Sequence, residues 1–173
     1  RTEAMHDLLH FNDIEVGDVF ETNRRTVTET DVVNFAGMTG DFTPLHVDHE
    51  YARNTPFRKP IAHGLLGLSL LAGLSSRCPN MATAAFISVR DWKFLKPIYF
   101  GDTLHVKTEV IEKRQHGRRR GEVIWHRELI NQDGQVVQSG VFETLVDVAV
   151  PQKSGKKGDG ELVSIPHPAK QSA

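Results

Sequence analysis

The segment from Ile61 to Leu74 constrains the fold more than any other part of the chain, because it is apolar on every face. Its leucines do not follow one helical stripe, and only His63 and Ser69 interrupt it with polar side chains. A helix that is apolar all round must be covered on nearly all sides. A membrane span needs about 20 apolar residues, which this segment does not reach. We therefore expect a buried central helix and no membrane-spanning segment.

Two glycines, Gly67 and Gly73, lie inside this predicted helix. Each costs roughly 1 kcal/mol of helix propensity relative to alanine. Close approach of other backbone is a good reason to tolerate them.

Strand patterns follow the helix. We expect strands over 84–94, 104–111, 123–130 and 136–148, with an Asp133-Gly134 hairpin turn before the last. In 104–111 apolar and polar residues alternate, which is typical of a strand. The economical packing is an α+β fold in which a curved antiparallel sheet wraps around the helix. One sheet covers only part of a helix, so we expect a homodimer or a higher homo-oligomer.

The part of the chain before the helix carries weaker signals. Val19 to Val27 is a strand candidate, and Thr28 is a plausible N-cap for a short helix, with Asp31 three positions on. The segment 37–44 is too rich in Gly, Thr and Pro to stay helical, which places Asp41 on a loop. A second short helix is expected over 49–54. We assign residues 1–150 to one domain and 151–173, a polar stretch without periodicity, to a C-terminal extension.

Composition excludes several functional classes. The formal net charge is −1, so no bulk field draws the protein to nucleic acid or to a membrane surface. The single cysteine, Cys78, allows no internal disulfide and is compatible with a reducing compartment. No apolar leader is evident near residue 1. We expect a cytoplasmic protein with no nucleic-acid or membrane partner.

Gly40-Asp41-Phe42-Thr43-Pro44-Leu45-His46 is the segment that suggests chemistry. The tight turn between Asp41 and His46 can bring a carboxylate and an imidazole to one small volume, where they can hold a water molecule. The carboxylate can take a proton from that water while the imidazole orients it. The alternative is a surface Asp/His pair without chemistry.

Pro60-Ile61-Ala62-His63-Gly64, at the start of the predicted helix, adds a second component. A helix N-terminus presents unpaired N–H groups, and Gly64 has no side chain to shield them. Such donors can stabilise an enolate oxygen formed on a thioester carbonyl. Alternatively, Gly64 only lets the helix begin close to the sheet, and His63 either touches a ligand or packs at the helix start.

These blocks, together with Phe94-Leu95-Lys96-Pro97 and Gly101-Asp102-Thr103-Leu104, resemble the MaoC-like dehydratases and R-specific enoyl-CoA hydratases over roughly residues 11–148. The resemblance implies a hotdog fold, usually dimeric, and reversible addition of water to a trans-2-enoyl thioester. It implies Asp41 and His46 as the catalytic pair and Gly64 as the oxyanion donor. Thr43 stands where the motif has Asn, and we expect it, with His63 and Gly64, among the oxyanion or substrate-binding residues.

The resemblance also implies an acyl-CoA or acyl-carrier-protein thioester as the substrate, with no cofactor. Two other functions stay open: a hotdog acyl-CoA thioesterase, and a non-catalytic protein that binds acyl-CoA or an acyl carrier. The Asp-to-His spacing favours hydration over thioester cleavage, and Thr43 keeps the binding protein open. His46, Asp48 and His49 form a candidate metal cluster, but such spacing does not fix a ligand set, so we expect no metal.

The one basic run, Lys113 to Gly121, contains Arg118, Arg119 and Arg120 and joins two predicted strands. We interpret it as a solvated hairpin tip, because charge runs usually lie in solvent. The alternative is a contact with CoA phosphates or with an acidic carrier protein.

Overall fold

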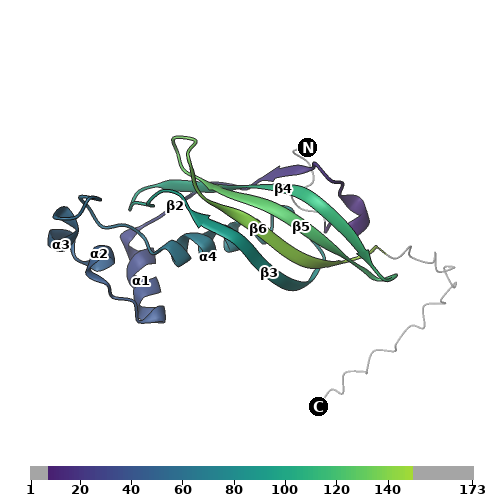
Figure 1. Ribbon diagram of the computed structural model, residues 1–173, viewed down its shortest axis with the longest axis horizontal. Coiled ribbons are helices and arrows are strands. Elements are labelled where there is room, and N and C mark those ends of the chain that lie inside the picture. Colours follow the sequence, from purple (N-terminus) through teal and green to yellow (C-terminus); the bar gives the residue numbers. More distant parts are fainter. Residues whose placement is uncertain (1–7, 150–173) are drawn as a thin grey trace, which may run out of the picture.

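The computed structural model describes residues 8–149. An antiparallel sheet lies against one long helix, and three shorter helices gather at one end of the molecule (Figure 1). The helical elements are the 3₁₀ turn η1 (Phe11–Asp13), α1 (Glu29–Thr39), α2 (Pro44–Val47), α3 (His49–Arg53) and α4 (Gly64–Ser75). The strands are β1 (Val19–Glu21), β2 (Arg25–Thr26), β3 (Thr83–Phe94), β4 (Thr103–His116), β5 (Arg120–Ile130) and β6 (Val136–Asp147).

The sheet has the order β1-β4-β5-β6-β3, and the short strand β2 also pairs with β4. Strands β4, β5 and β6 form consecutive antiparallel hairpins. Strand β3 precedes them in the chain but pairs with β6 at the far edge. The α+β prediction, with one antiparallel sheet and one central helix, is confirmed.

The core lies between α4 and the inward face of the sheet. The alternation predicted for β4 is confirmed, since Leu104, Val106, Thr108 and Val110 are all buried. Strand β6 shows the same pattern. Its buried positions from Gln138 onward are Gln138, Gly140, Phe142, Thr144 and Val146. A polar residue, Gln138, therefore occupies an inward position beside the helix.

Helix α4 is not covered on all sides within one chain. Leu66, Leu70 and Leu71 are buried, whereas Leu65 is 60% exposed and Ala72 is also exposed. The expectation that other backbone approaches its glycines is wrong in kind for Gly67, where side chains approach instead and an added Cβ would lie 2.3 Å from the Gln138 amide. It is wrong for Gly73 within the described part of the chain, where an added Cβ would meet nothing within 4 Å.

Helix α1 begins as predicted. The Thr28 side chain accepts a hydrogen bond from the Asp31 N–H, and the Asp31 carboxylate accepts one from the Thr28 N–H. The prediction that residues 37–44 leave the helix is wrong for 37–39, because α1 continues to Thr39. It ends at Gly40, whose φ of 78° suits glycine. Asp41 does lie on the loop that follows.

Other boundaries shift by a few residues. The strand predicted over 19–27 is divided into β1 and β2, and α2 was not predicted. Strand β4 extends to His116 and β5 begins at Arg120, so Lys113 and Arg114 belong to β4 and only residues 117–119 of the basic run form the turn. No helix among residues 8–149 is long and apolar enough to cross a membrane. The predicted extension, 151–173, lies outside the described residues.

Candidate active site

The loop between α1 and α2 holds Asp41 through Thr43. The Thr43 N–H and hydroxyl both donate to Asp41 Oδ1, at 3.2 and 2.6 Å. Pro44, at the start of α2, fits there because the first residues of a helix need no N–H donor. Thr43 therefore holds the carboxylate by one oxygen and leaves Oδ2 directed away from it.

These hydrogen bonds set the charge state of Asp41. The Thr43 hydroxyl and then the Thr43 N–H hold the pKa of Asp41 below its ordinary value, and nearby His63 and His46 lower it further. The Asp41 side chain is 48% exposed. It is therefore an ionised carboxylate at neutral pH, able to accept hydrogen bonds from water.

His46 forms a hydrogen bond with the segment that precedes α4. Its Nδ1 lies 2.7 Å from the carbonyl oxygen of Ile61. Because a carbonyl only accepts, Nδ1 carries the proton and donates it, which leaves Nε2 of the neutral ring with a lone pair.

His63 lies behind the pair and is 3% exposed. Its Nε2 donates to the backbone carbonyl of Asp41 at 2.9 Å, and its ring stacks on His46 with centroids 3.9 Å apart. His63 is also the N-cap residue of α4, although its side chain makes no capping hydrogen bond. It thus connects the Asp41 loop to the start of the central helix.

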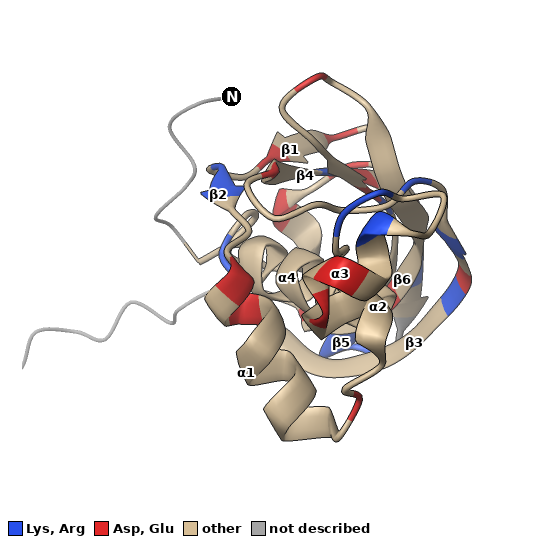
Figure 2. Ribbon diagram, turned by 90° about the vertical axis from the view of Figure 1, so that its left-hand side faces the viewer, with Lys and Arg blue, Asp and Glu red and all other residues tan. Residues whose placement is uncertain are grey.

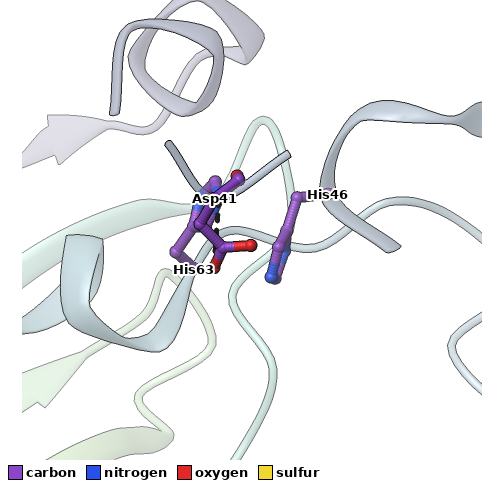
Figure 3. A group of neighbouring side chains, drawn as sticks. All are labelled: Asp41, His46 and His63. Atoms are coloured by element: carbon purple, nitrogen blue, oxygen red, sulfur yellow. Dashed lines mark hydrogen bonds and ion pairs between the residues drawn. The ribbon is translucent and has the colours of Figure 1, made fainter. Parts of the chain in front are cut away.

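Figure 3 shows the three side chains together, with the Asp41 carboxylate turned toward the His46 ring. One ligand-type atom from each of Asp41, His46 and His63 lies within 4.8 Å of the others. The structure therefore brings together the two residues of the predicted catalytic pair and adds His63. A carboxylate oxygen and an imidazole nitrogen at this separation leave room for one bridging water molecule.

The N-terminus of α4 lies beside this group. Gly64 is the first residue of α4 and is exposed. Its N–H makes no hydrogen bond within residues 8–149. A Cβ at this position would lie 2.9 Å from the Phe94 ring. Glycine therefore keeps both the N–H open and the aromatic ring of β3 in place.

A cavity of about 330 Å³ opens at this helix end. His46 and Gly64 both line it, together with Phe94 and Gln138. The remaining lining residues are Phe57, Ile61, Ala62, Leu95, Lys96, Pro97 and Ile98. The cavity therefore joins one member of the predicted pair to the predicted oxyanion donor inside a mostly apolar space.

Gln138 is a site residue that the sequence analysis missed. It is 2% exposed, and its Nε2 donates to the Gly64 carbonyl at 2.9 Å. Its Oε1 is buried without a partner in the described residues. The sequence signal that could have indicated it is a polar residue at an inward position of β6, because a buried amide needs hydrogen-bond partners.

The residues of the candidate metal cluster have other hydrogen-bond partners. Asp48 caps α3 by accepting from the N–H groups of Glu50 and Tyr51, and His49 lies 2.9 Å from Glu29. The cluster of His46, Asp48 and His49 therefore does not converge on one point. In the Asp41 group, His46 Nδ1 and His63 Nε2 both donate to backbone carbonyls, so only His46 Nε2 and the buried His63 Nδ1 could offer lone pairs. The expectation of no metal and no cofactor stays a prediction.

The β4–β5 turn that carries Arg118 and Arg119 lies at the end of the molecule opposite α1, α2 and α3 (Figure 1). Arg120 pairs with Asp147 at 3.0 Å. Viewed from the α1–α3 end, basic segments follow α3 in the chain (Figure 2). Arg58 and Lys59 lie in that stretch, next to residues that line the cavity.

The chain matches a known protein family over most of the described residues. The family model described as a MaoC like domain matches residues 12–132. A curated 3-hydroxybutyryl-CoA dehydratase from Methylorubrum extorquens is 39% identical over 113 residues, which are 65% of this chain and 70% of that protein. An (R)-specific enoyl-CoA hydratase from Rhodospirillum rubrum is 35% identical over 98 residues, covering 57% of this chain and 66% of that protein.

Solved structures agree on the architecture. A Mycobacterium tuberculosis protein described as having a double hotdog fold superposes with a TM-score of 0.74 at 22% identity. The match covers 95% of this chain and 53% of that one. The expected hotdog fold is thereby confirmed.

Proposed function

Because the chain belongs to the MaoC-like dehydratase family, we propose that it is a hydro-lyase that adds water reversibly to a trans-2-enoyl thioester and gives the R-3-hydroxyacyl thioester. The observation that carries the proposal is the position of His46 and Gly64 on one apolar cavity, with Asp41 beside His46. Hydration needs a base for water and a donor for the enolate oxygen, and we assign these roles to Asp41 and Gly64.

Water activation falls to Asp41 and His46. A water molecule between them donates one O–H to the Asp41 carboxylate and the other to His46 Nε2. As the water oxygen bonds to the β-carbon, Asp41 takes the first proton, and the double-bond electrons move to the thioester oxygen. Such general base help contributes about 10²–10⁴-fold.

Gly64 stabilises the enolate that results. Its free N–H points from the positive end of α4, where a developing negative charge is favoured. Asp41 then returns its proton to the α-carbon, and the thioester carbonyl re-forms. One water has been added across the double bond, and the enzyme is unchanged.

Gln138 contributes by position. Its hydrogen bond to the Gly64 carbonyl ties the first turn of α4 to β6. The N–H of Gly64 is thereby held still while charge develops, which is the condition under which an oxyanion donor is effective.

The thioester carrier is proposed to be coenzyme A or an acyl carrier protein, with the acyl chain in the cavity beside α4. Arg58, Lys59, Lys93 and Lys96 are the basic residues in or next to the lining segments, and phosphate groups favour such residues. Arg118 and Arg119 lie at the opposite end of the same chain, which favours the solvated-tip interpretation. The lone Cys78 is buried and free, in keeping with the cytoplasmic location that we propose.

An absorbance assay with crotonyl-CoA separates this function from its alternatives. The expected result is loss of the enoyl absorbance without release of free thiol, and formation of the R-3-hydroxy product on chiral analysis. Release of thiol would instead identify a thioesterase. Tight binding of crotonyl-CoA without any change in absorbance would identify a binding protein.

We also propose that two copies form a dimer through β3. This strand is an edge of the sheet, and Ile87 on it is 48% exposed. A long apolar edge strand is a template for pairing with another chain. Leu65 on the open face of α4 adds apolar surface that a second copy would cover.

A further inference from the structure

A charged residue that the proposed hydration does not use lies buried at the other end of α4. Arg127, on β5, is 8% exposed, and its side chain faces the helix. Its Nη1 donates to the Ser75 hydroxyl at 2.9 Å. This is the one hydrogen bond that its guanidinium makes within residues 8–149, although a guanidinium has five N–H donors.

No carboxylate compensates this charge in the described part of the chain. The ion pairs formed there do not include Arg127, and its Nε is buried without a partner. The ring of Phe142 lies 4.6 Å from the guanidinium carbon. Burial lowers the pKa of Arg127 to about 10, so it keeps its charge at neutral pH. The end of α4 offers only about half an elementary negative charge.

The guanidinium faces a second cavity, of about 220 Å³. Arg127, Ser75 and Thr144 are among the polar residues that line it, and Pro79, Met81, Phe86 and Trp125 provide apolar walls. The Trp125 N–H is already bound to the Thr144 hydroxyl at 2.8 Å. Of these polar groups, Arg127 is the one that carries a charge and has donors to spare.

We propose that this cavity binds an alkyl carboxylate, with its carboxylate on the free edge of Arg127 and its alkyl chain against Met81, Phe86 and Trp125. Carboxylates form strong charge-assisted hydrogen bonds with arginine, and four of the five guanidinium N–H groups of Arg127 have no partner within residues 8–149. The apolar walls exclude a fully hydrated anion such as phosphate, because its remaining oxygens would lose their hydrogen bonds.

The carboxylate has two possible sources. One is a free short-chain acid. The other is the far end of a thioester substrate that carries a terminal carboxylate. Ser75 is separated from Gly64 by nearly the whole of α4, about 16 Å at the helical rise, so only a long acyl chain would reach. The free-acid source is independent of the hydratase proposal, whereas the substrate source depends on it.

The binding test titrates the full chain with hexanoate or with its neutral counterpart hexanamide and measures binding by titration calorimetry. The expected result is saturable binding of hexanoate, with no binding of hexanamide or of inorganic phosphate. Loss of a charge-assisted pair in Arg127→Gln should weaken hexanoate binding about 10- to 100-fold. Arg119→Gln, an exposed arginine in the β4–β5 turn, is the matched control and should bind as the unaltered protein does.

A second variant covers the case in which Arg127→Gln does not fold. Ala72 lines the cavity from an exposed position of α4, so Ala72→Leu should fill the space without disturbing Arg127. That variant is expected to remain folded by circular dichroism and to lose hexanoate binding. Equal binding of hexanoate and hexanamide, or unaltered binding in Ala72→Leu, would overturn the proposal.

The source is identified by comparing long enoyl-CoA substrates that end in a carboxylate with methyl-ended ones of equal length. A substrate source predicts a higher kcat/KM for the carboxylate-ended series and loss of that preference in Arg127→Gln. A free-acid source predicts hexanoate binding with no such preference. No hexanoate binding and no preference together would contradict the site, even if hydration of crotonyl-CoA is normal.

Discussion

Thr43 donates two hydrogen bonds, from its N–H and from its hydroxyl, to the same carboxylate oxygen of Asp41. Thr43, the residue that departs from the family motif, is therefore hydrogen-bonded directly to the proposed base. Its two donors keep Asp41 ionised and fix the direction of the second oxygen.

Thr43→Val removes one of these donors. Since the hydroxyl is the largest cause of the lowered pKa of Asp41, that pKa should rise toward its ordinary value. The acid limb of kcat/KM should then move to higher pH, while Thr43→Ser keeps the profile of the unaltered protein. An identical acid limb in Thr43→Val would show that the hydroxyl does not set the charge of the base.

Gly64→Ala tests the helix start. A Cβ there would lie 2.9 Å from the Phe94 ring, so either the ring or the first turn of α4 must move. We expect kcat to fall by about 10- to 100-fold, because displacement of a donor by even 1 Å can have such an effect. Gly73→Ala is the control in the same helix. It should keep its activity and gain roughly 0.5–1 kcal/mol in urea denaturation. Full activity in Gly64→Ala would contradict the oxyanion role.

Thr28→Ala tests the position of α1, whose C-terminus leads into the Asp41 loop. Loss of the cap should lower the free energy of unfolding by about 1 kcal/mol. Burial alone would raise the pKa of Asp31, but its hydrogen bonds with Thr28 and the charge of Arg25 lower it on balance. The stability that Asp31 contributes is thus present above its unfolded pKa of about 3.9 and is lost as pH falls through the lower folded value.

Urea denaturation at neutral pH and near pH 3 measures both effects. The difference between Thr28→Ala and the unaltered protein should shrink at the lower pH, where the unfolded chain binds a proton at Asp31 and the stability from the ionised carboxylate is reduced. A constant difference at both pH values would contradict the assigned coupling between Thr28 and the Asp31 carboxylate.

Ile87→Glu tests the proposed β3 interface. Ile87 is 48% exposed on the edge strand, and a charge there would oppose pairing with a second copy. Analytical ultracentrifugation should show a monomer for Ile87→Glu in place of the dimer. The control Val33→Glu, at a residue 50% exposed on α1, should leave the dimer intact. A dimer that survives Ile87→Glu would place the interface elsewhere.

Local sequence patterns predicted the elements with strong periodicity or capping. The alternation in β4, the apolar run of α4 and the Thr28 cap each appear in the structure where expected. Boundaries were harder to predict: residues 37–39 have low helix propensity, yet α1 continues through them to the left-handed C-cap at Gly40. The division of 19–27 into β1 and β2 depends on pairing with β4, which no local pattern encodes.

The residues of the site could likewise be predicted from the sequence only where a local motif contains them. Asp41, His46 and Gly64 belong to short motifs and were visible as residues, but their separation was not. Gln138 and Arg127 reach α4 only through the sheet, since each is more than 50 positions away from its partner on that helix. The stacking of His63 on His46 likewise depends on the path of the chain between them.

The hydration rate of Asp41→Asn tests the central claim most directly. Asp41 is half exposed, so the variant should keep the fold and unfold at nearly the same urea concentration. With crotonyl-CoA, kcat should fall by about 10²–10⁴-fold, because the amide cannot take the proton from water. A folded Asp41→Asn that hydrates crotonyl-CoA at the rate of the unaltered protein would contradict Asp41 as the base.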